Sequence, residues 1–264
     1  MGTGADGVLK LLSRRERLIR ELCDEPHTKQ ELVGSLECSR STIDRALRRL
    51  VDERLVEHDG GTYRLTLQGS LAFAEFERFS NRVSGVLEAS DVLDVLPADC
   101  GLDAIVFESA TVVEANRTAP HEPLETYLDD VRRADSVRAL GSVVIPQYVQ
   151  TFRDRLVDGG IEGTFVLESA AIEHLVVEHR STLAEVVELD RFSLREVETT
   201  PPFSLALFEI GDSTRLGVLV YVTEGVRGYV ATDDPEAVEW GETLFDRHLV
   251  SGTEISAVAE IDAG

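Results

Sequence analysis

Cysteine, lysine and long apolar runs are scarce in this chain of 264 residues. The cysteines stand at positions 23, 38 and 100 without a CxxC pair, which excludes a disulfide framework and a zinc ribbon. The longest apolar run, residues 216–222, is far shorter than the roughly 20 residues that span a bilayer. The first residues lack a basic stretch followed by an apolar one. We therefore expect no signal peptide, no membrane partner and a cytoplasmic location.

The charge balance is strongly acidic, with 49 Asp and Glu against 26 Lys and Arg. Residues 1–90 hold 14 basic and 15 acidic side chains, whereas the remaining residues hold 12 basic and 34 acidic. Such an acidic surface repels DNA, so any nucleic-acid contact is confined to the N-terminal part. Only Lys10 and Lys29 are lysines, and this pattern predicts a halophilic protein kept in solution at high salt. The alternative is an ordinary acidic protein from a GC-rich genome.

Residues 28–69 carry an ordered set of local signals. Thr28 and Glu31 form a capping box at the start of a short helix, and a turn near residues 34–38 follows. A second helix is expected from Arg40 to about Arg54. Strands at 55–57 and 62–65 then flank a Gly-Gly hairpin turn. This order predicts a winged helix-turn-helix DNA-binding domain over residues 1–67.

The second helix of this pair has one apolar and one cationic face. Ile43, Ala46, Leu47 and Leu50 recur at helical spacing, so the opposite face cannot be core. Arginine can grip guanine bidentately, and we expect Arg45 to be the main base reader. The residues expected to contact DNA, including one from the wing, are Ser39, Arg40, Ser41, Thr42, Arg45, Arg48, Arg49 and Arg64. The alternatives are a solvated face laced by pairs such as Asp44 with Arg48, or a winged helix that binds protein.

Residues 68–90 are expected to form a linking and dimerisation helix. Its apolar residues alternate at spacings of four and three, which is typical of a two-helix seam: Ala72, Phe76, Phe79, Val83 and Val86. The alternative is that this stripe packs on the protein's own core. We favour a homodimer, because two recognition helices would read two half-sites of duplex DNA.

Residues 91–264 alternate between strand and helix patterns, which predicts an acidic α/β domain for sensing or regulation. Strands are expected at residues 102–107, 137–144, 164–168, 192–197, 204–210, 216–223 and 227–232. Helices are expected at residues 123–133, 147–158, 170–189 and from Pro235 onward. The last three strands follow one another through short turns, which indicates an antiparallel meander beside a parallel portion of a mixed sheet.

Four stretches carry a family resemblance: residues 120–124, residues 146–160, the strand from Phe203 and, most specifically, residues 233–245. Together with the N-terminal winged helix, they resemble haloarchaeal transcriptional regulators with a methanogenesis or filament regulator domain. The resemblance covers most of the chain. It implies an archaeal DNA-binding regulator whose acidic domain senses an effector or dimerises, and it implies no particular ligand.

Motifs for catalysis are missing from the sequence. A phosphodiesterase would need a His-x-Lys pair, and no lysine follows Lys29. The G-x-S-x-G elbow, the P-loop and a strand followed by GxGxxG are absent as well. His174 and His179 would lie about 140° apart on a regular helix, which argues against a shared metal. We therefore expect neither an enzyme, nor a cofactor, nor a metal site.

An effector site can be placed only by architecture, because ligands favour crevices at the carboxyl ends of parallel strands. That rule nominates His121, Tyr148 and Glu168, and the alternative is that these are ordinary loop residues. We interpret the chain as a dimeric transcription regulator that binds double-stranded DNA and whose acidic domain either senses an effector, such as a small molecule, or serves dimerisation or a partner contact. A protein-interaction winged helix and an enzyme with an accessory winged helix are the other hypotheses.

Overall fold

The computed structural model describes residues 4–223 and 225–255, and the chain divides into two compact units, Met1–Asn81 and Arg82–Gly264. The boundary falls inside the long helix α4, Leu67–Glu88. The sequence patterns place boundaries at residues 67 and 90 instead, because they mark the ends of this helix.

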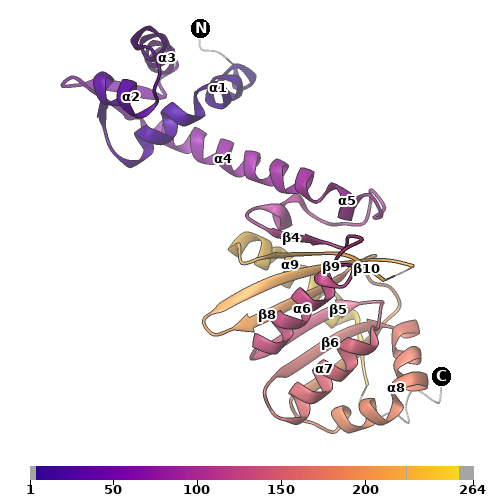
Figure 1. Cartoon of the computed structure of the whole chain (residues 1–264). Helices are drawn as coiled ribbons and strands as arrows, with labels where there is room; N and C mark the ends of the chain where they lie inside the picture. Colours follow the sequence, from indigo (N-terminus) through magenta and orange to yellow (C-terminus); the bar gives the residue numbers. More distant parts are fainter. Residues whose placement is uncertain (1–3, 224, 256–264) are drawn as a thin grey trace. The chain divides into compact units, whose positions relative to one another are not determined.

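The N-terminal unit is a winged helix-turn-helix (Figure 1). Its elements before α4 are α1 Ala5–Asp24, β1 His27–Thr28, α2 Lys29–Ser35, α3 Arg40–Asp52, β2 Val56–Asp59 and β3 Thr62–Leu65. The three strands form an antiparallel sheet in the order β1-β3-β2. The capping box at α2 is present, since Glu31 N donates to Thr28 Oγ1 at 3.3 Å and Thr28 N donates to Glu31 Oε2 at 2.7 Å.

The C-terminal unit is built on an eight-stranded mixed sheet (Figure 1). Its strands are β4 Thr111–Glu114, β5 Ser136–Gly141, β6 Glu162–Glu168, β7 Phe192–Val197, β8 Ser204–Ile210, β9 Ser213–Val222, β10 Gly225–Thr232 and β11 Thr253–Glu254. The order is β11-β7-β6-β5-β8-β9-β10-β4. Strands β5, β6 and β7 are parallel, and β8, β9 and β10 form the antiparallel meander. The expected α/β class with a mixed sheet is confirmed.

Helices cover both faces of this sheet. The helical elements are α5 Ser90–Leu93, the 3₁₀ helix η1 Ala104–Phe107, α6 Glu122–Arg133, α7 Pro146–Val157, α8 Ser169–Val187 and α9 Pro235–Ser251. Helices α6, α7 and α8 pack on one face, and α5, η1 and α9 pack on the other. Along β8, Ala206 and Phe208 enter the core between the sheet and α6, α7 and α8. Leu205 and Leu207 enter the core between the sheet and α5, η1 and α9. This alternation explains why β8 is continuously apolar from Leu205 to Phe208, as strands buried on both faces are.

Two expectations for this unit are wrong. Residues 102–107, expected as a strand, contain η1, because the Asp103 carboxylate accepts a hydrogen bond from Ile105 N at 2.9 Å and starts a turn. The edge strand β4 was not expected. It pairs antiparallel with β10, and its burial is only partial.

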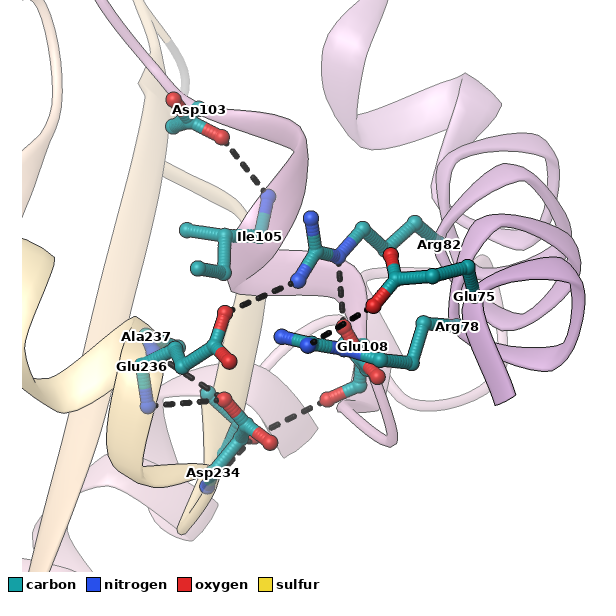
Figure 2. Close-up of polar contacts among 10 residues, drawn as sticks. Glu75, Arg78, Arg82, Asp103, Ile105, Glu108, Asp234, Glu236 and Ala237 are labelled. Atoms are coloured by element: carbon teal, nitrogen blue, oxygen red, sulfur yellow. Dashed lines mark hydrogen bonds and ion pairs between the residues drawn. The ribbon is translucent and has the colours of Figure 1, made fainter. Parts of the chain in front are cut away.

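The last turns of α4 are held within the C-terminal unit by Arg82 (Figure 2). Its Nε donates to Glu108 Oε2 at 2.5 Å, and its Nη2 donates to Glu236 Oε2 at 3.1 Å. Glu236 lies in the first turn of α9, which is capped by Asp234. One ion pair therefore connects the end of α4 to the loop after η1, and the other connects it to the start of α9.

Four of the five tyrosines are enclosed in the C-terminal core: Tyr127, Tyr148, Tyr221 and Tyr229. Burial raises the pKa of all four hydroxyls. The negative charge of Asp130 adds to the rise in the pKa of Tyr229, whose hydroxyl donates to Asp130 Oδ2 at 2.7 Å. The neutral phenols are therefore the form that the fold requires.

We predict that the protein loses stability steeply above pH 10. A phenol whose folded pKa exceeds its unfolded value of about 10 stabilises fully below pH 10, and this contribution is lost as the pH rises toward the folded pKa. Each such tyrosine removes about 1.4 kcal/mol per pH unit in that window. Urea unfolding at pH 9, 10 and 11 measures the slope. Tyr148→Phe should make the slope shallower, whereas Tyr63→Phe in the wing should leave it unchanged; equal slopes in all three proteins would contradict the prediction.

Candidate nucleic-acid interface and effector site

Helix α3 buries one face and exposes the other. Ile43, Ala46, Leu47 and Leu50 are at most 2% exposed and join the core of the N-terminal unit. On the outer side Arg40, Arg45, Arg48 and Arg49 are all exposed. The helix ends at Asp52, and Arg54 follows with a positive φ of 58°, so α3 is two residues shorter than expected. The arginines all remain within it.

The arginines of α3 are not neutralised by the helix's own acid. Asp44 forms an ion pair with Lys29 at the start of α2, and this hydrogen bond lowers the pKa of the Asp44 carboxyl. Among the described residues, no carboxylate lies within ion-pair distance of Arg40, Arg45, Arg48 or Arg49. Asp44 is therefore paired with Lys29 rather than with Arg48, although the charges of Arg40 and Arg48 also lower the pKa of its carboxyl.

Arg45 lies along the helix surface. Its Nε donates to the carbonyl of Ser41, one turn earlier, at 3.2 Å. That bond uses one of the five N–H donors of the guanidinium and fixes its orientation. Arg45 is thus held toward the N-terminal half of α3, the part of a recognition helix that meets base edges.

Three hydroxyls gather at the N-terminus of α3. Ser39 Oγ accepts a hydrogen bond from Thr42 N at 3.3 Å, and it lies 2.8 Å from Thr42 Oγ1 and 3.1 Å from Ser41 Oγ. A helix N-terminus carries partial positive charge and attracts phosphate. The expected Ser39, Ser41 and Thr42 are therefore brought together in one place.

The wing is a two-residue hairpin between β2 and β3. Gly60 and Gly61 both have positive φ, 58° and 94°. A two-residue hairpin turn of type I′ requires positive φ at both of its central residues, and glycine adopts such angles without strain. Arg64 projects from β3, but its Nε donates to Glu57 Oε1 on β2 at 2.7 Å. The Glu57 carboxylate therefore competes with DNA for the Arg64 guanidinium, which is the contact expected of the wing.

Helix α1 adds a basic region that the sequence interpretation missed. Arg14, Arg15 and Arg17 line a groove of about 360 Å³ together with Cys38 and Thr42 at the start of α3. The signal was the Arg-Arg-Glu-Arg run at residues 14–17. The cationic surface therefore extends from α3 onto α1.

The apolar stripe of α4 is divided between different environments. Ala72 and Phe76 pack in the core of the N-terminal unit, and Val86 packs in a core of the C-terminal unit. For these three residues the alternative of packing on the protein's own core is correct. Phe79 and Val83 stay exposed at 63% and 41%, and Leu87, one turn further on, is exposed at 68%. These last three residues are spaced by four and form one exposed stripe.

The three residues nominated for an effector lie in different surroundings. Tyr148, near the start of α7, is buried and lines an apolar cavity between α7, α8 and the sheet. Glu168, at the end of β6, accepts hydrogen bonds from Thr200 N at 2.6 Å and Thr200 Oγ1 at 2.8 Å. His121 precedes α6 on the exposed surface. Of the three, Tyr148 alone is among the residues that line this cavity.

His174 and His179 lie closer than a regular helix would place them. Their ring centroids are 6.3 Å apart, because His179 leaves the helical conformation with φ −131° and ψ 27°. Across residues 4–223 and 225–255, no group of three or more His, Cys, Asp or Glu side chains could hold a metal ion. No helix in the same ranges combines the length and apolar character needed to cross a membrane.

Two family models match separate parts of the chain. Residues 120–250 match the middle domain of the methanogenesis regulatory protein FilR1. Residues 7–87 match the HVO_A0261 N-terminal domain. Among curated proteins, no match is found. The first range covers most of the C-terminal unit, and the second covers the winged helix together with nearly all of α4.

Three solved structures that resemble this chain are remote from it in sequence. TrmBL2, described as an archaeal chromatin protein with a novel mode of DNA binding, shares 15% identity over 96% of this chain and 100% of its own, with a TM-score of 0.42. Nuc from Salmonella typhimurium, a phospholipase D family member, shares 12% identity over 56% of this chain and 99% of its own, with a TM-score of 0.44. NucT from Helicobacter pylori shares 11% over the same 56% and 99%, with a TM-score of 0.43.

Proposed function

We propose that this protein is an archaeal transcription regulator that binds duplex DNA as a homodimer and responds to a small-molecule effector. The observation that carries the proposal is the outer face of α3, where four exposed arginines lie opposite a buried apolar face. In a winged helix-turn-helix this helix enters the major groove. The match of residues 120–250 to a domain of a regulatory protein supports the same role.

The arginines are assigned by position. Arg45 and Arg48 lie at the centre of the outer face and would read base edges, whereas Arg40 and Arg49 would contact phosphates. The hydroxyls of Ser39, Ser41 and Thr42 would hold a phosphate at the helix N-terminus. Arg64 would contact the DNA backbone or minor groove from the wing, and its guanidinium would leave the Glu57 carboxylate to do so.

The exposed stripe of Phe79, Val83 and Leu87 is the proposed dimer contact. Three large apolar side chains at a spacing of four make a continuous ridge, and burying it against its copy removes that surface from water. The paired α4 helices would set the distance between two α3 helices and so the spacing of the half-sites. An effector bound in the C-terminal unit would act by changing the angle between these helices.

The C-terminal unit is proposed as a binding domain rather than an enzyme, working in the cytoplasm at high salt. With 49 acidic residues and only two lysines, the chain suits a concentrated salt solution. Release of counterions contributes little there, so specificity depends on direct contacts and DNA shape.

Replacement of Arg45 or Arg48 by alanine is expected to weaken binding to specific DNA by about 5- to 150-fold, since a base-reading arginine contributes roughly 1–3 kcal/mol. Fluorescence anisotropy with operator fragments recovered by chromatin immunoprecipitation, in a KCl series, gives the affinities. Arg132→Ala on α6, which removes an exposed arginine paired with Asp129, is the matched control and should bind DNA normally. Unchanged affinity in both α3 variants would favour a protein-binding winged helix instead.

Glu57→Gln is expected to tighten DNA binding about two- to fivefold. The substitution releases Arg64 from its partner and removes a negative charge from the wing, and an exposed pair of this kind contributes only about 0.2–1 kcal/mol. The same anisotropy assay measures the change. Glu75→Gln, an exposed acid of α4, serves as control. If neither Glu57→Gln nor Arg64→Ala alters the affinity, the wing does not contact DNA.

Phe79→Glu is expected to raise the dissociation constant of the dimer by roughly 30-fold or more, the effect of losing about 2 kcal/mol at the centre of an interface. Light scattering and sedimentation at several protein concentrations report the oligomeric state. Leu67→Glu is the matched control, because Leu67 is 77% exposed but lies about 120° away from Phe79 around α4. A monomeric wild-type protein, or a dimer that tolerates Phe79→Glu, would exclude this contact.

A further inference from the structure

A cavity of about 110 Å³ lies in the C-terminal unit beneath α7 and α8. Its floor is formed by the carboxyl-terminal halves of two parallel strands, with Ala139 and Gly141 from β5 and Phe165 and Leu167 from β6. Figure 1 shows both helices over these strands. The cavity therefore lies at the end of the sheet where α/β folds place their ligands.

Apolar side chains make up nearly all of the wall. Phe152, Leu156, Leu183 and Val186 face it from α7 and α8. Phe152 meets Phe165 edge to face, with ring centroids 5.1 Å apart. An unfilled apolar space of this size is costly, because its lining loses packing contacts.

Two buried hydroxyls belong to the same wall. Tyr148 from α7 is 8% exposed, and Tyr221 lies near the end of β9. Burial raises the pKa of both, and each hydroxyl influences the pKa of the other, so the two lie close together. Within the part of the chain that the structure describes, neither hydroxyl makes a hydrogen bond of normal geometry, although Tyr148, Tyr221 and Ser204 lie close enough to influence one another. Buried polar groups are nearly always paired, so both remain available to a ligand.

Glycine at position 141 keeps the polar corner of the cavity open. A Cβ atom there would come within 2.2 Å of Ser204 Oγ, and Ser204 itself lines the cavity beside Tyr221. Any larger residue would push the serine side chain away from its place. Tyr148, Tyr221 and Ser204 thus gather at one corner of a cavity whose wall is mostly apolar.

Charge around the cavity disfavours an anion. Arg153 borders it, but Nε and Nη2 of this arginine donate to the two carboxylate oxygens of Glu185, both at 2.9 Å. The positive charge is therefore already compensated. A charged ligand would also lose its hydration on entering an apolar space.

We propose that this cavity binds a small, neutral, largely apolar molecule with a single oxygen, of about five to seven heavy atoms, whose oxygen pairs with Tyr148 and Tyr221. An apolar cavity of about 150 Å³ binds benzene, so a space of about 110 Å³ takes a ligand no larger than a single ring with one small substituent. The inference rests on the proposed effector role of the C-terminal unit and names the chemical class of the effector. It does not depend on DNA binding.

Calorimetry and ligand-observed NMR with phenol, benzene and benzoate test the proposal on the full-length protein without DNA. Phenol should bind about five to ten times more tightly than benzene, the gain from pairing a buried hydroxyl. Benzoate should bind more weakly than both. Absence of phenol binding, equal affinities for phenol and benzene, or a preference for benzoate would overturn the proposal.

Two variants locate the binding. Tyr221→Phe should reduce the preference for phenol over benzene toward one while benzene still binds, and Tyr148→Phe offers a second route to the same result. Ala139→Leu should fill the cavity and abolish binding of both probes. DNA affinity and circular dichroism of each variant report separately on the winged helix and the fold. Phenol binding that survives Ala139→Leu would place the ligand elsewhere. A wild-type protein that binds phenol but no DNA would count against the proposed regulator and not against this site.

Discussion

The structure of the proposed interface depends on one constraint, the burial of the apolar face of α3. Ile43, Ala46, Leu47 and Leu50 are enclosed by the N-terminal core, so the helix cannot rotate without exposing them. Successive side chains of a helix leave its axis at a fixed angular interval, so burial of one face also fixes the direction in which the arginines point. The hydrophobic effect therefore sets the orientation of the cationic face, although the residues that bind are polar.

The C-terminal unit shows how a sheet buried on both faces creates a site. Strands β5 to β8 pack against helices on each side, and their side chains alternate between two cores. Where β5 and β6 end, the covering helices α7 and α8 leave a space that the side chains do not fill. The position of the cavity follows from the parallel topology, whereas its chemistry follows from the few residues, such as Tyr148 and Gly141, that reach it.

The local patterns of the sequence were sufficient for elements whose signals lie within a few residues. The capping box at Thr28, the hairpin turn at Gly60 and the strands β7 and β8 occur where the sequence predicts them. Residues 102–107 were assigned wrongly because the cap from Asp103 outweighs the alternating pattern. The cavity and the division of the α4 stripe depend on partners brought together only by folding, and no spacing along the chain indicates them. The pairing of Arg64 with Glu57, in contrast, follows from the register that the two-residue turn at Gly60 and Gly61 imposes on the hairpin.

Arginine has two opposite uses in this acidic protein, and its partners distinguish them. In the C-terminal unit Arg82, Arg138, Arg153 and Arg215 each donate to at least one carboxylate of another element. Their ion pairs join one helix, strand or loop to another, as the pair of the buried Asp130 with Arg215 illustrates. The arginines of α3 have no carboxylate within ion-pair distance among the described residues, so their charge faces the solvent. In a chain with 49 acidic residues, this exposed cationic face is the feature on which the proposed contact with DNA depends.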